Sequence, residues 1–364
     1  MAKPDRMVAE LLQPGGVMSL KQLGLESCLG AFDSSPLSGF YVMRGADNGI
    51  YAPFPEGHEA RAFEHGAFVM ALRDRARRAP NVEFIETTVT ALLENEDTNR
   101  IIGVSACKTG GQPEAYFADL VVVADGGLSK FRTAVLGHMP YEPSQMGYLA
   151  GLIVKDLTLP VAKCATMIVL KRAGPVVLYE LPNNECRMLV EFKEPPPDLK
   201  EHILRDVVPQ LPASLRAPIL NALETSRLRR APHYYLPSMK QGESSKAGAL
   251  LMGDSLNMRH PLTAGGMTVA LNDAVILSDL LADIESFGNW NEVSAVLRKW
   301  HHLRKPLAST INTMSMSWAG LFAAEGEAFD IMQDGAFKFF GKGPEYSEEP
   351  MALAAGIAKS PLRL

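Results

Sequence analysis

Residues 249–267 read ALLMGDSLNMRHPLTAGGM, and this stretch decides the fold. Its first four residues are all apolar, which is typical of a short strand buried on both faces of a sheet. Asp254 follows that strand directly, and the carboxyl ends of strands in α/β sheets are where ligands bind. Apolar residues then recur at spacings of three and four, which predicts a helix over about 266–284. We therefore expect a strand, a ligand-binding loop and a helix.

The loop has the chemistry of a nucleotide-like ligand site. Asp254 can accept hydrogen bonds from sugar-like hydroxyls, and Gly265 and Gly266 let a ligand approach the backbone. The helix that they open presents free N–H groups and a partial positive charge to a ligand that carries negative charge. The alternative is a plain strand, loop and helix in which the glycines serve only packing.

A second motif, VVVADGGLSKFR at residues 121–132, repeats the pattern of a buried strand that ends in an acidic residue. The strand is predicted over 120–124, and Asp125 follows it at a glycine-rich turn. Lys130 and Arg132 come next, on the helix expected after the turn. An ordinary Asp-Gly turn without a ligand is the alternative interpretation.

The rest of the chain predicts further sheets and helices. Residues 4–14 are expected to form a helix that Pro14-Gly15-Gly16 breaks. Strands over 82–93 and 101–108 predict a meander, and the strand-like runs of 148–193 predict a second sheet. A long apolar helical face from Val293 to Leu321 is expected to be interrupted at Pro306.

Composition excludes several classes of protein. A chain of 364 residues with 47% hydrophobic and 21% charged residues is a globular protein of about two domains. The net charge is −5 and no Lys/Arg stripe is present, which excludes a nucleic-acid surface. Four widely spaced cysteines without a CxxC pair predict free thiols and no metal site. No signal peptide and no apolar run of about 18 residues is found.

These motifs, with the opening stretch PDRMVAELLQPGG at residues 4–16, resemble those of squalene monooxygenases (squalene epoxidases). The RHPL core at residues 259–262 separates this family from other members of the flavin-dependent aromatic-hydroxylase-like superfamily. The resemblance implies an α/β fold: an FAD/NAD(P)-binding Rossmann-like three-layer domain, here incomplete, an inserted mixed-sheet substrate domain, and carboxyl-terminal helices. The expected ranges are 1–38, 61–146 and 246–290 for FAD binding, 39–60 and 147–245 for substrate, and 291–364 for a helical membrane-associating region.

The resemblance also implies site residues, position by position. The residues expected at FAD are Arg6, Leu11, Arg73, Val89, Asp125, Asp254, Gly265, Gly266 and Met267. Those expected in the substrate pocket are Gln13, Phe40, Tyr41, His260 and Pro261. No side chain is expected to act as a catalytic residue or metal ligand, because the flavin carries the hard step.

Two positions depart from the family pattern. Ala264 stands where the family usually has a glycine, which adds a methyl group beside the flavin loop. Phe40 stands where the family commonly has a tyrosine, and it has no hydroxyl with which to orient a neighbour. Tyr41 follows directly, but in a strand its side chain would face the other way.

The implied activity is epoxidation of squalene in sterol biosynthesis, with FAD, O2 and electrons from NADPH through a partner cytochrome reductase. The expected location is the cytosolic face of the endoplasmic reticulum membrane, reached by the face from Val293 to Leu321 and by Phe337, Phe339 and Phe340. No GxGxxG and no ribose-binding acidic residue precede the opening stretch, and the tail over 359–364 stops before the membrane helix that the family usually has. Two alternatives stay open: an inactive truncated fragment or pseudoenzyme that binds an isoprenoid or a partner, and another flavin-dependent hydroxylase with a smaller substrate.

Overall fold

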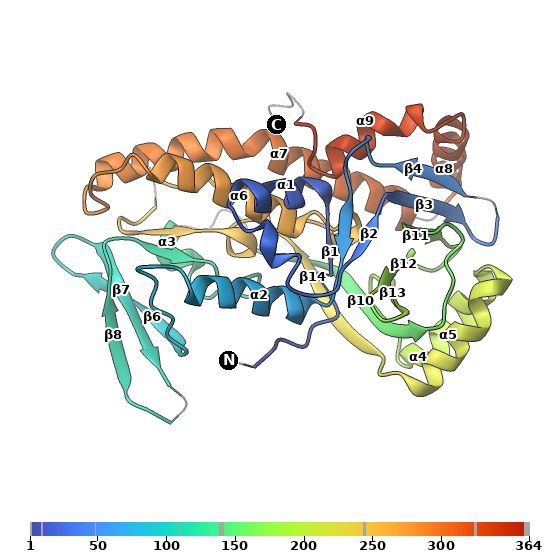
Figure 1. Cartoon of the computed structure of the whole chain (residues 1–364), viewed down its shortest axis with the longest axis horizontal. Helices are drawn as coiled ribbons and strands as arrows, with labels where there is room; N and C mark the ends of the chain where they lie inside the picture. The colour runs from blue at the N-terminus through green and yellow to red at the C-terminus, as the bar shows by residue number, and fades with distance from the viewer. Residues whose placement is uncertain are drawn as a thin grey trace.

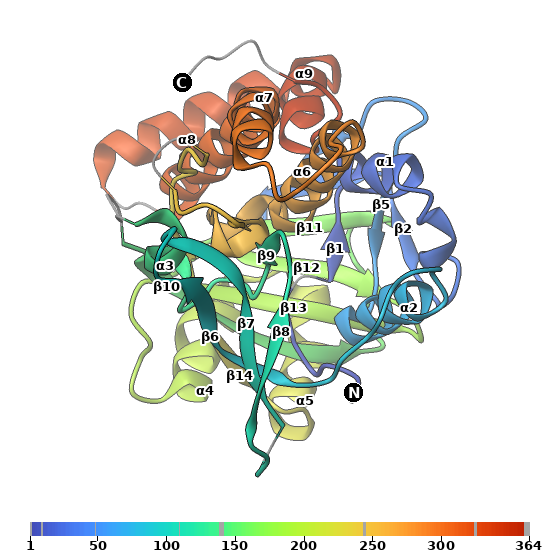
Figure 2. The same ribbon diagram turned by 90° about the vertical axis from the view of Figure 1, so that its left-hand side faces the viewer.

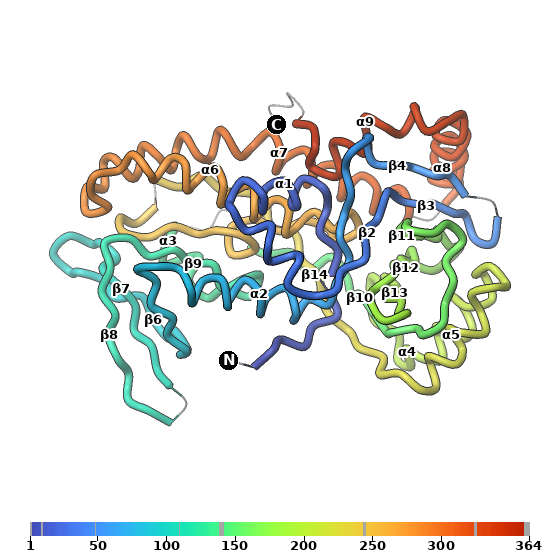
Figure 3. Tube along the Cα trace, in the orientation of Figure 1, coloured from blue at the N-terminus to red at the C-terminus, as the bar shows by residue number. Residues whose placement is uncertain are grey.

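The computed structural model describes residues 2–8, 10–47, 49–108, 110–137, 142–242, 245–323 and 326–359. Figure 1 shows a large sheet at one end of the molecule, a strand meander at the other, and long helices that run above both. Figure 2 shows the same helices stacked on the sheets from the side, and Figure 3 traces the chain through these layers. The last five residues of the predicted tail, 360–364, lie outside the described residues.

The largest sheet has seven strands in the order β14-β10-β13-β12-β11-β3-β4. Its strands are β3 (Gly39–Arg44), β4 (Ile50–Pro53), β10 (Ser144–Lys155), β11 (Cys164–Val169), β12 (Val176–Leu181), β13 (Glu185–Phe192) and β14 (Arg229–Tyr235). β3 and β11 are parallel and the other neighbours antiparallel, so the predicted mixed sheet is confirmed. The strands come from the two stretches predicted for the substrate domain, although β10 begins already at Ser144.

Side chains alternate between the two faces of this sheet, as the twofold period of a strand requires. On one face, Met43 and Ile168 pack with α5 (Ala213–Thr225) in a large apolar core. On the other face, Phe40 and Met167 pack towards the loop after β15 and the carboxyl-terminal helices. The second face is the one that meets the predicted flavin loop.

The two motif strands pair with each other. β9 (Val121–Val123) and β15 (Ala249–Leu251) are adjacent and parallel. The predicted burial on both faces is confirmed for β15, but it is wrong for β9, where Val122 is 47% exposed. The Gln241 side chain closes the other edge of β15, where it accepts from the Leu251 N–H at 2.6 Å and donates to the Leu251 carbonyl at 2.9 Å. A buried side chain thus takes the place of a neighbouring strand.

Smaller elements surround this pair. The predicted meander is confirmed as β6 (Thr88–Asn95), β7 (Arg100–Cys107) and β8 (Pro113–Phe117). A three-stranded sheet contains β1 (Leu11–Leu12), β5 (Ala60–Ala62) and β2 (Ser35–Leu37). The helices near them are α1 (Pro14–Gln22), α2 (His65–Arg77) and α3 (Arg132–Leu136).

The described residues after β15 form four α-helices: α6 (Gly266–Leu281), α7 (Trp290–Ala323), α8 (Glu327–Phe340) and α9 (Glu345–Ala354). The predicted interruption at Pro306 is wrong, because α7 continues through it. Buried contacts on both sides of the proline, at Arg304 and Leu307, hold the helix where the proline removes a backbone hydrogen bond. Among the described residues, no helix has both the length and the apolarity to cross a membrane.

The helix predicted over residues 4–14 is also wrong. Residues 2–8 and Glu10 are irregular, Leu11 and Leu12 pair with β5, and Pro14 begins α1 instead of ending a helix. The Glu10 carboxylate is 1% exposed and accepts two hydrogen bonds from Arg187, at 2.7 and 2.9 Å. This buried ion pair and the strand pairing hold the segment extended, and local helix propensity cannot offset them.

A buried ion pair joins helices α6 and α7 and contributes to the stability of the fold. Arg304 donates two hydrogen bonds to the Asp273 carboxylate, at 2.9 and 2.6 Å, and each side chain is about 1% exposed. Asp273→Ala leaves the buried guanidinium uncompensated, so it is expected to lower the free energy of unfolding by about 3–5 kcal/mol. Urea denaturation followed by circular dichroism measures the loss. The control Asp74→Ala removes an exposed i,i+3 pair with Arg77 and should cost less than about 1 kcal/mol; equal losses in both variants would contradict the prediction.

Candidate cofactor site

The two predicted acidic residues lie at the same edge of one sheet. Because β9 and β15 are parallel neighbours, Asp125 and Asp254 follow strands whose carboxyl ends lie side by side. Both residues are exposed. This edge therefore presents two carboxylates to a ligand, as the motifs predict.

Arg132 fixes the two loops that carry these carboxylates. Its buried guanidinium donates to the carbonyls of Gly127 and Ser255, each at 2.7 Å, and to that of Asp254 at 3.1 Å. Burial lowers the pKa of Arg132, and the nearby Asp125 and Asp254 carboxylates oppose that shift. The resemblance only placed Arg132 near the motif. The contacts show that the Arg132 side chain joins one loop to the other.

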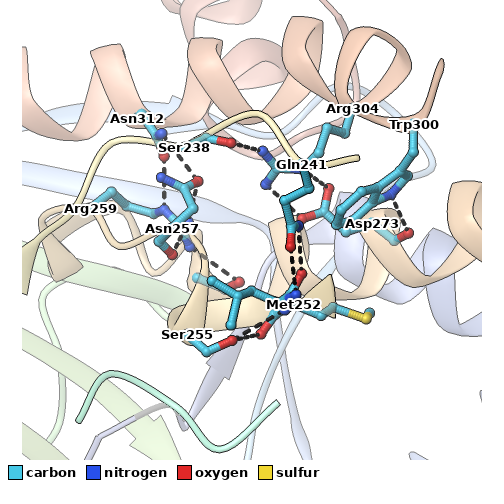
Figure 4. Close-up of polar contacts among 12 residues, drawn as sticks. Ser238, Gln241, Met252, Ser255, Asn257, Arg259, Asp273, Trp300, Arg304 and Asn312 are labelled. Atoms are coloured by element: carbon cyan, nitrogen blue, oxygen red, sulfur yellow. Dashed lines mark hydrogen bonds and ion pairs between the residues drawn. The ribbon is translucent and has the colours of Figure 1, made fainter. Parts of the chain in front are cut away.

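The loop between β15 and α6 contains two short 3-10 turns, Gly253–Ser255 and Pro261–Thr263, and is mostly buried. Side chains satisfy several of its polar groups (Figure 4). The Arg259 guanidinium donates to the Asn312 side chain of α7 at 2.8 Å and to the Asn257 side chain at 2.7 Å. Asn257 in turn donates to the Leu236 carbonyl at 2.8 Å. Ser255 donates to the Val123 carbonyl of β9 at 2.7 Å. The loop is thereby tied to β9, α7 and the end of the large sheet.

Three residues at the start of α6 differ in conformation and surroundings. Ala264 has φ 51°, a left-handed conformation that favours glycine, so the family's glycine at this position has a steric reason. A Cβ on Gly265 would lie 2.3 Å from Ile311 Cγ2, so this glycine serves packing against α7. A Cβ on Gly266 would meet only the Arg259 side chain, at 3.5 Å, so here the backbone can be approached. The packing alternative therefore holds for Gly265 and not for Gly266.

Buried polar atoms without a protein partner also gather around this turn. Gln13 donates from Nε2 to the Thr263 carbonyl at 2.7 Å, whereas its Oε1 has no partner among the described residues. The hydroxyls of Thr263 and Thr268 are likewise buried and unpartnered there. α6 has 16 residues and no acidic side chain in its first turn, so its dipole favours a negatively charged group. A flavin ring offers donors, acceptors and, when reduced, negative charge, so these residues fit FAD.

The remaining residues expected at FAD are spread over several elements. Leu11 is buried in β1, and Met267 packs against the core that contains Leu12 and Phe63. The side chains expected from α2, β6 and the opening segment are not part of the buried group. Arg73 on α2 donates to the Ala2 carbonyl at 3.1 Å, Val89 is exposed on β6, and Arg6 is exposed ahead of β1.

The residues expected at the substrate separate into two groups. Phe40 is 6% exposed and lines an apolar pocket between the large sheet and the carboxyl-terminal helices, whereas Gln13, Pro261 and His260 belong to the loop region. Tyr41 lies on the opposite face of β3, where its hydroxyl accepts a hydrogen bond from the Gly49 N–H at 2.8 Å. It therefore does not replace a hydroxyl at position 40.

The pocket is lined almost wholly by apolar side chains. Its lining residues are Phe40, Val42, Ile50, Ala52, Met167, Trp318, Leu321, Phe322, Ala336, Phe337, Phe340, Ser347, Pro350 and Met351. The Ser347 hydroxyl already donates to the Pro344 carbonyl at 2.8 Å. Leu262 and Ala264 of the flavin loop pack in the same apolar cluster as Phe40, Met167 and Met351. One continuous apolar region thus joins the pocket to the flavin loop.

Comparison with solved structures shows the fold. p-Nitrophenol 4-monooxygenase from Pseudomonas putida DLL-E4 superimposes with a TM-score of 0.76 at 14% identity, over 100% of this chain and 91% of that one. A variant of HpxO from Klebsiella pneumoniae, solved in complex with FAD, gives a TM-score of 0.69 at 17% identity, over 95% and 88% of the two chains. The chain therefore has the fold of FAD-dependent monooxygenases.

Comparison of sequences is more specific. The family model for squalene epoxidase matches residues 117–364. The squalene epoxidase of Aspergillus fumigatus is 37% identical over 99% of this chain and 76% of its own length. The loops that carry Asp125 and Asp254, the start of α6 and the fold all agree with these matches. This protein therefore belongs to the squalene epoxidase family.

Proposed function

We propose that this protein epoxidises squalene, with FAD as cofactor and O2 as oxygen source, in sterol biosynthesis. The observation that carries the proposal is the apolar pocket that continues into the flavin loop through Leu262 and Ala264. Squalene is a hydrocarbon without any hydrogen-bonding group. A binding site for it needs shape and apolar surface, and any unpaired polar group in the site would cost free energy.

FAD, when bound, supplies the activation of O2 and the transfer of one oxygen atom. The chain's own residues bind and orient the cofactor and substrate. Asp125 and Asp254 offer acceptors at the sheet edge, and Gln13, Thr263 and Thr268 offer buried polar atoms at the start of α6. The apolar pocket excludes water from the double bond. No acid or base side chain has to attack the alkene.

The lining of the pocket argues against the alternative of a smaller, polar substrate. A phenol-type substrate would need a donor or acceptor to orient its hydroxyl, since buried polar groups are nearly always hydrogen-bonded. Ser347 is the one hydroxyl among the lining residues, and it already has a partner. Titration with FAD and the squalene epoxidation assay test the alternative of an inactive protein.

We also propose that electrons come from NADPH through a partner cytochrome reductase, and that the protein works on the cytosolic face of the endoplasmic reticulum membrane. Squalene partitions into bilayers, so the enzyme has to collect it at a membrane surface. α8 supports contact with a membrane surface, because Ile331, Met332 and Phe339 expose 64%, 57% and 47% of their surface. The other residues expected at the membrane lie elsewhere: Phe337 and Phe340 line the pocket, and the apolar face of α7 packs in the core.

FAD binding depends on the contacts that hold the loops carrying Asp125 and Asp254. Arg132→Met removes the donors that join these loops, so the dissociation constant for FAD is expected to rise at least about tenfold. Quenching of flavin fluorescence on titration with the protein measures it. Lys130→Met removes an exposed charge of the same loop and serves as the control. Equal affinity in the wild type and Arg132→Met would contradict this account of the site.

Turnover depends on the dry lining of the pocket. Phe337→Ser places a hydroxyl where α8 lines the pocket, so kcat/KM for squalene is expected to fall at least about tenfold with FAD affinity unchanged. Squalene epoxide is quantified by mass spectrometry in detergent, with NADPH and a cytochrome reductase. The control, Phe339→Ser, changes an exposed phenylalanine of the same helix and should keep its turnover. Absence of epoxide with FAD-loaded wild-type protein and reductase would refute the proposed activity.

The same two variants separate turnover from membrane binding. Phe339→Ser removes one of the exposed apolar side chains of α8, so it is expected to reduce co-sedimentation with phospholipid vesicles several-fold, whereas Phe337→Ser should not. If both variants sediment like the wild type, α8 is not the contact surface.

A further inference from the structure

A buried cluster of titratable side chains lies between the large sheet and the flavin loop. It contains Glu191 of β13, His233 of β14 and His260 of the loop, each less than 9% exposed. One ligand-type atom from each residue lies within 4.8 Å of the other two. No local sequence pattern indicates this cluster, because the three residues are far apart in the chain.

The hydrogen bonds fix the proton on His260. The Leu262 N–H donates to His260 Nδ1 at 3.3 Å, so Nδ1 carries a lone pair and the proton of the neutral ring is on Nε2. His260 Nε2 lies 2.7 Å from Glu191 Oε1, the length of a strong hydrogen bond to a carboxylate. His260 is therefore a donor to Glu191. Coordination of a metal through Nε2, beside the Glu191 carboxylate, would need that lone pair free and Nδ1–H donated to an acceptor, which is the opposite arrangement.

His233 contributes ring packing to the cluster, and its ring nitrogens have no hydrogen-bond partner among the described residues. Its ring packs edge-on against that of His260 at 4.6 Å between centroids, and a Cβ on Gly147 would lie 3.0 Å from its Nε2. Burial, with a smaller effect of His260, lowers the pKa of His233 to about 4. His233 is therefore neutral at physiological pH, and its nearest approach to Glu191, 3.7 Å, is too long for a hydrogen bond. The Glu191 carboxylate stays directed at His260.

The same face of β13 holds a second segment of the cofactor site. Arg187, Leu189 and Glu191 are spaced by two, so their side chains lie on one face of the strand. Arg187 binds Glu10, three residues before Gln13, and Leu189 packs against the apolar cluster that contains Leu262. Gln13 in turn donates to Thr263 of the flavin loop. Two charged residues of one strand thus hold the two segments that form the polar end of the site.

We propose that Glu191 is a positioning residue of the cofactor site: its carboxylate holds His260 and so keeps the flavin loop in the shape that binds FAD. This inference rests on the proposed function, because it assumes that the loop binds FAD. It assigns a task in cofactor binding to a residue of the substrate sheet. The large sheet then fixes the flavin loop as well as covering the pocket.

The test is a set of substitutions at one position, with FAD affinity as the readout. Glu191→Leu keeps similar bulk but leaves the His260 N–H without an acceptor, so the dissociation constant for FAD is expected to rise at least about tenfold. Glu191→Gln keeps a carbonyl acceptor and should restore affinity to within about threefold of the wild type. Glu191→Asp withdraws the carboxylate by one methylene and should give an intermediate loss, which keeps the test valid if the leucine variant fails to fold. The thermal midpoint of each variant separates lost binding from lost fold.

The control is Glu185→Leu, since Glu185 lies on the same strand and pairs with Lys155 away from the flavin loop. It should keep the wild-type affinity for FAD. Wild-type affinity in folded Glu191→Leu would overturn the inference and leave the proposed function standing, whereas failure of the wild-type chain to bind FAD would overturn both. Tight binding of one equivalent of Zn²⁺ by the wild type, lost in Glu191→Leu and in His233→Ala, would replace the positioning role with a metal centre.

Discussion

The structure depends on one constraint: the loop between β15 and α6 is irregular, yet it is buried between three layers. Buried backbone and side-chain polar groups need partners, and a loop of this kind cannot supply all of them from its own backbone. Two 3-10 turns and the pairing of Met258 with Leu236 satisfy some of these groups, and side chains from other elements satisfy others. Asn312 of α7, Glu191 of β13, Gln13 ahead of α1 and Arg132 of α3 each bind a group in this loop or at its beginning. Four separate segments of the chain therefore hold the loop in place.

This arrangement explains why the polar and apolar halves of the site meet at one turn. At Ala264 the chain changes direction, with its polar atoms directed at Gln13 and its apolar side chains packed towards the pocket. The residues that would hold FAD therefore lie beside the apolar lining that would hold a hydrocarbon substrate. The apolar side needs no acid or base, in agreement with a reaction whose hard step belongs to the cofactor.

Buried polar pairs join the layers at three places: the ion pairs of Glu10 with Arg187 and Asp273 with Arg304, and the hydrogen bond from the neutral His260 ring to Glu191. Each links segments far apart in the chain. Such pairs are weak sources of net stability, since both partners lose hydration, but breaking one partner is costly. Their effect is to specify how the sheet, the loop and the long helices fit together.

The sequence by itself determined the parts whose signal is local. Two short apolar runs followed by Asp125 and Asp254 predicted two strands with a carboxylate at the end of each, and period-two runs predicted the mixed sheet and the meander. The RHPL motif pointed to the family. Only the tertiary structure decided that residues 4–14 are not a helix, that α7 continues through Pro306, and that Gly265 serves packing while Gly266 stays open. It also brought Glu191 and Asn312 to the flavin loop. The physical reason is that strand patterns and motifs depend on residues adjacent in the sequence. Buried partners come from distant residues, and their contacts can outweigh local propensity.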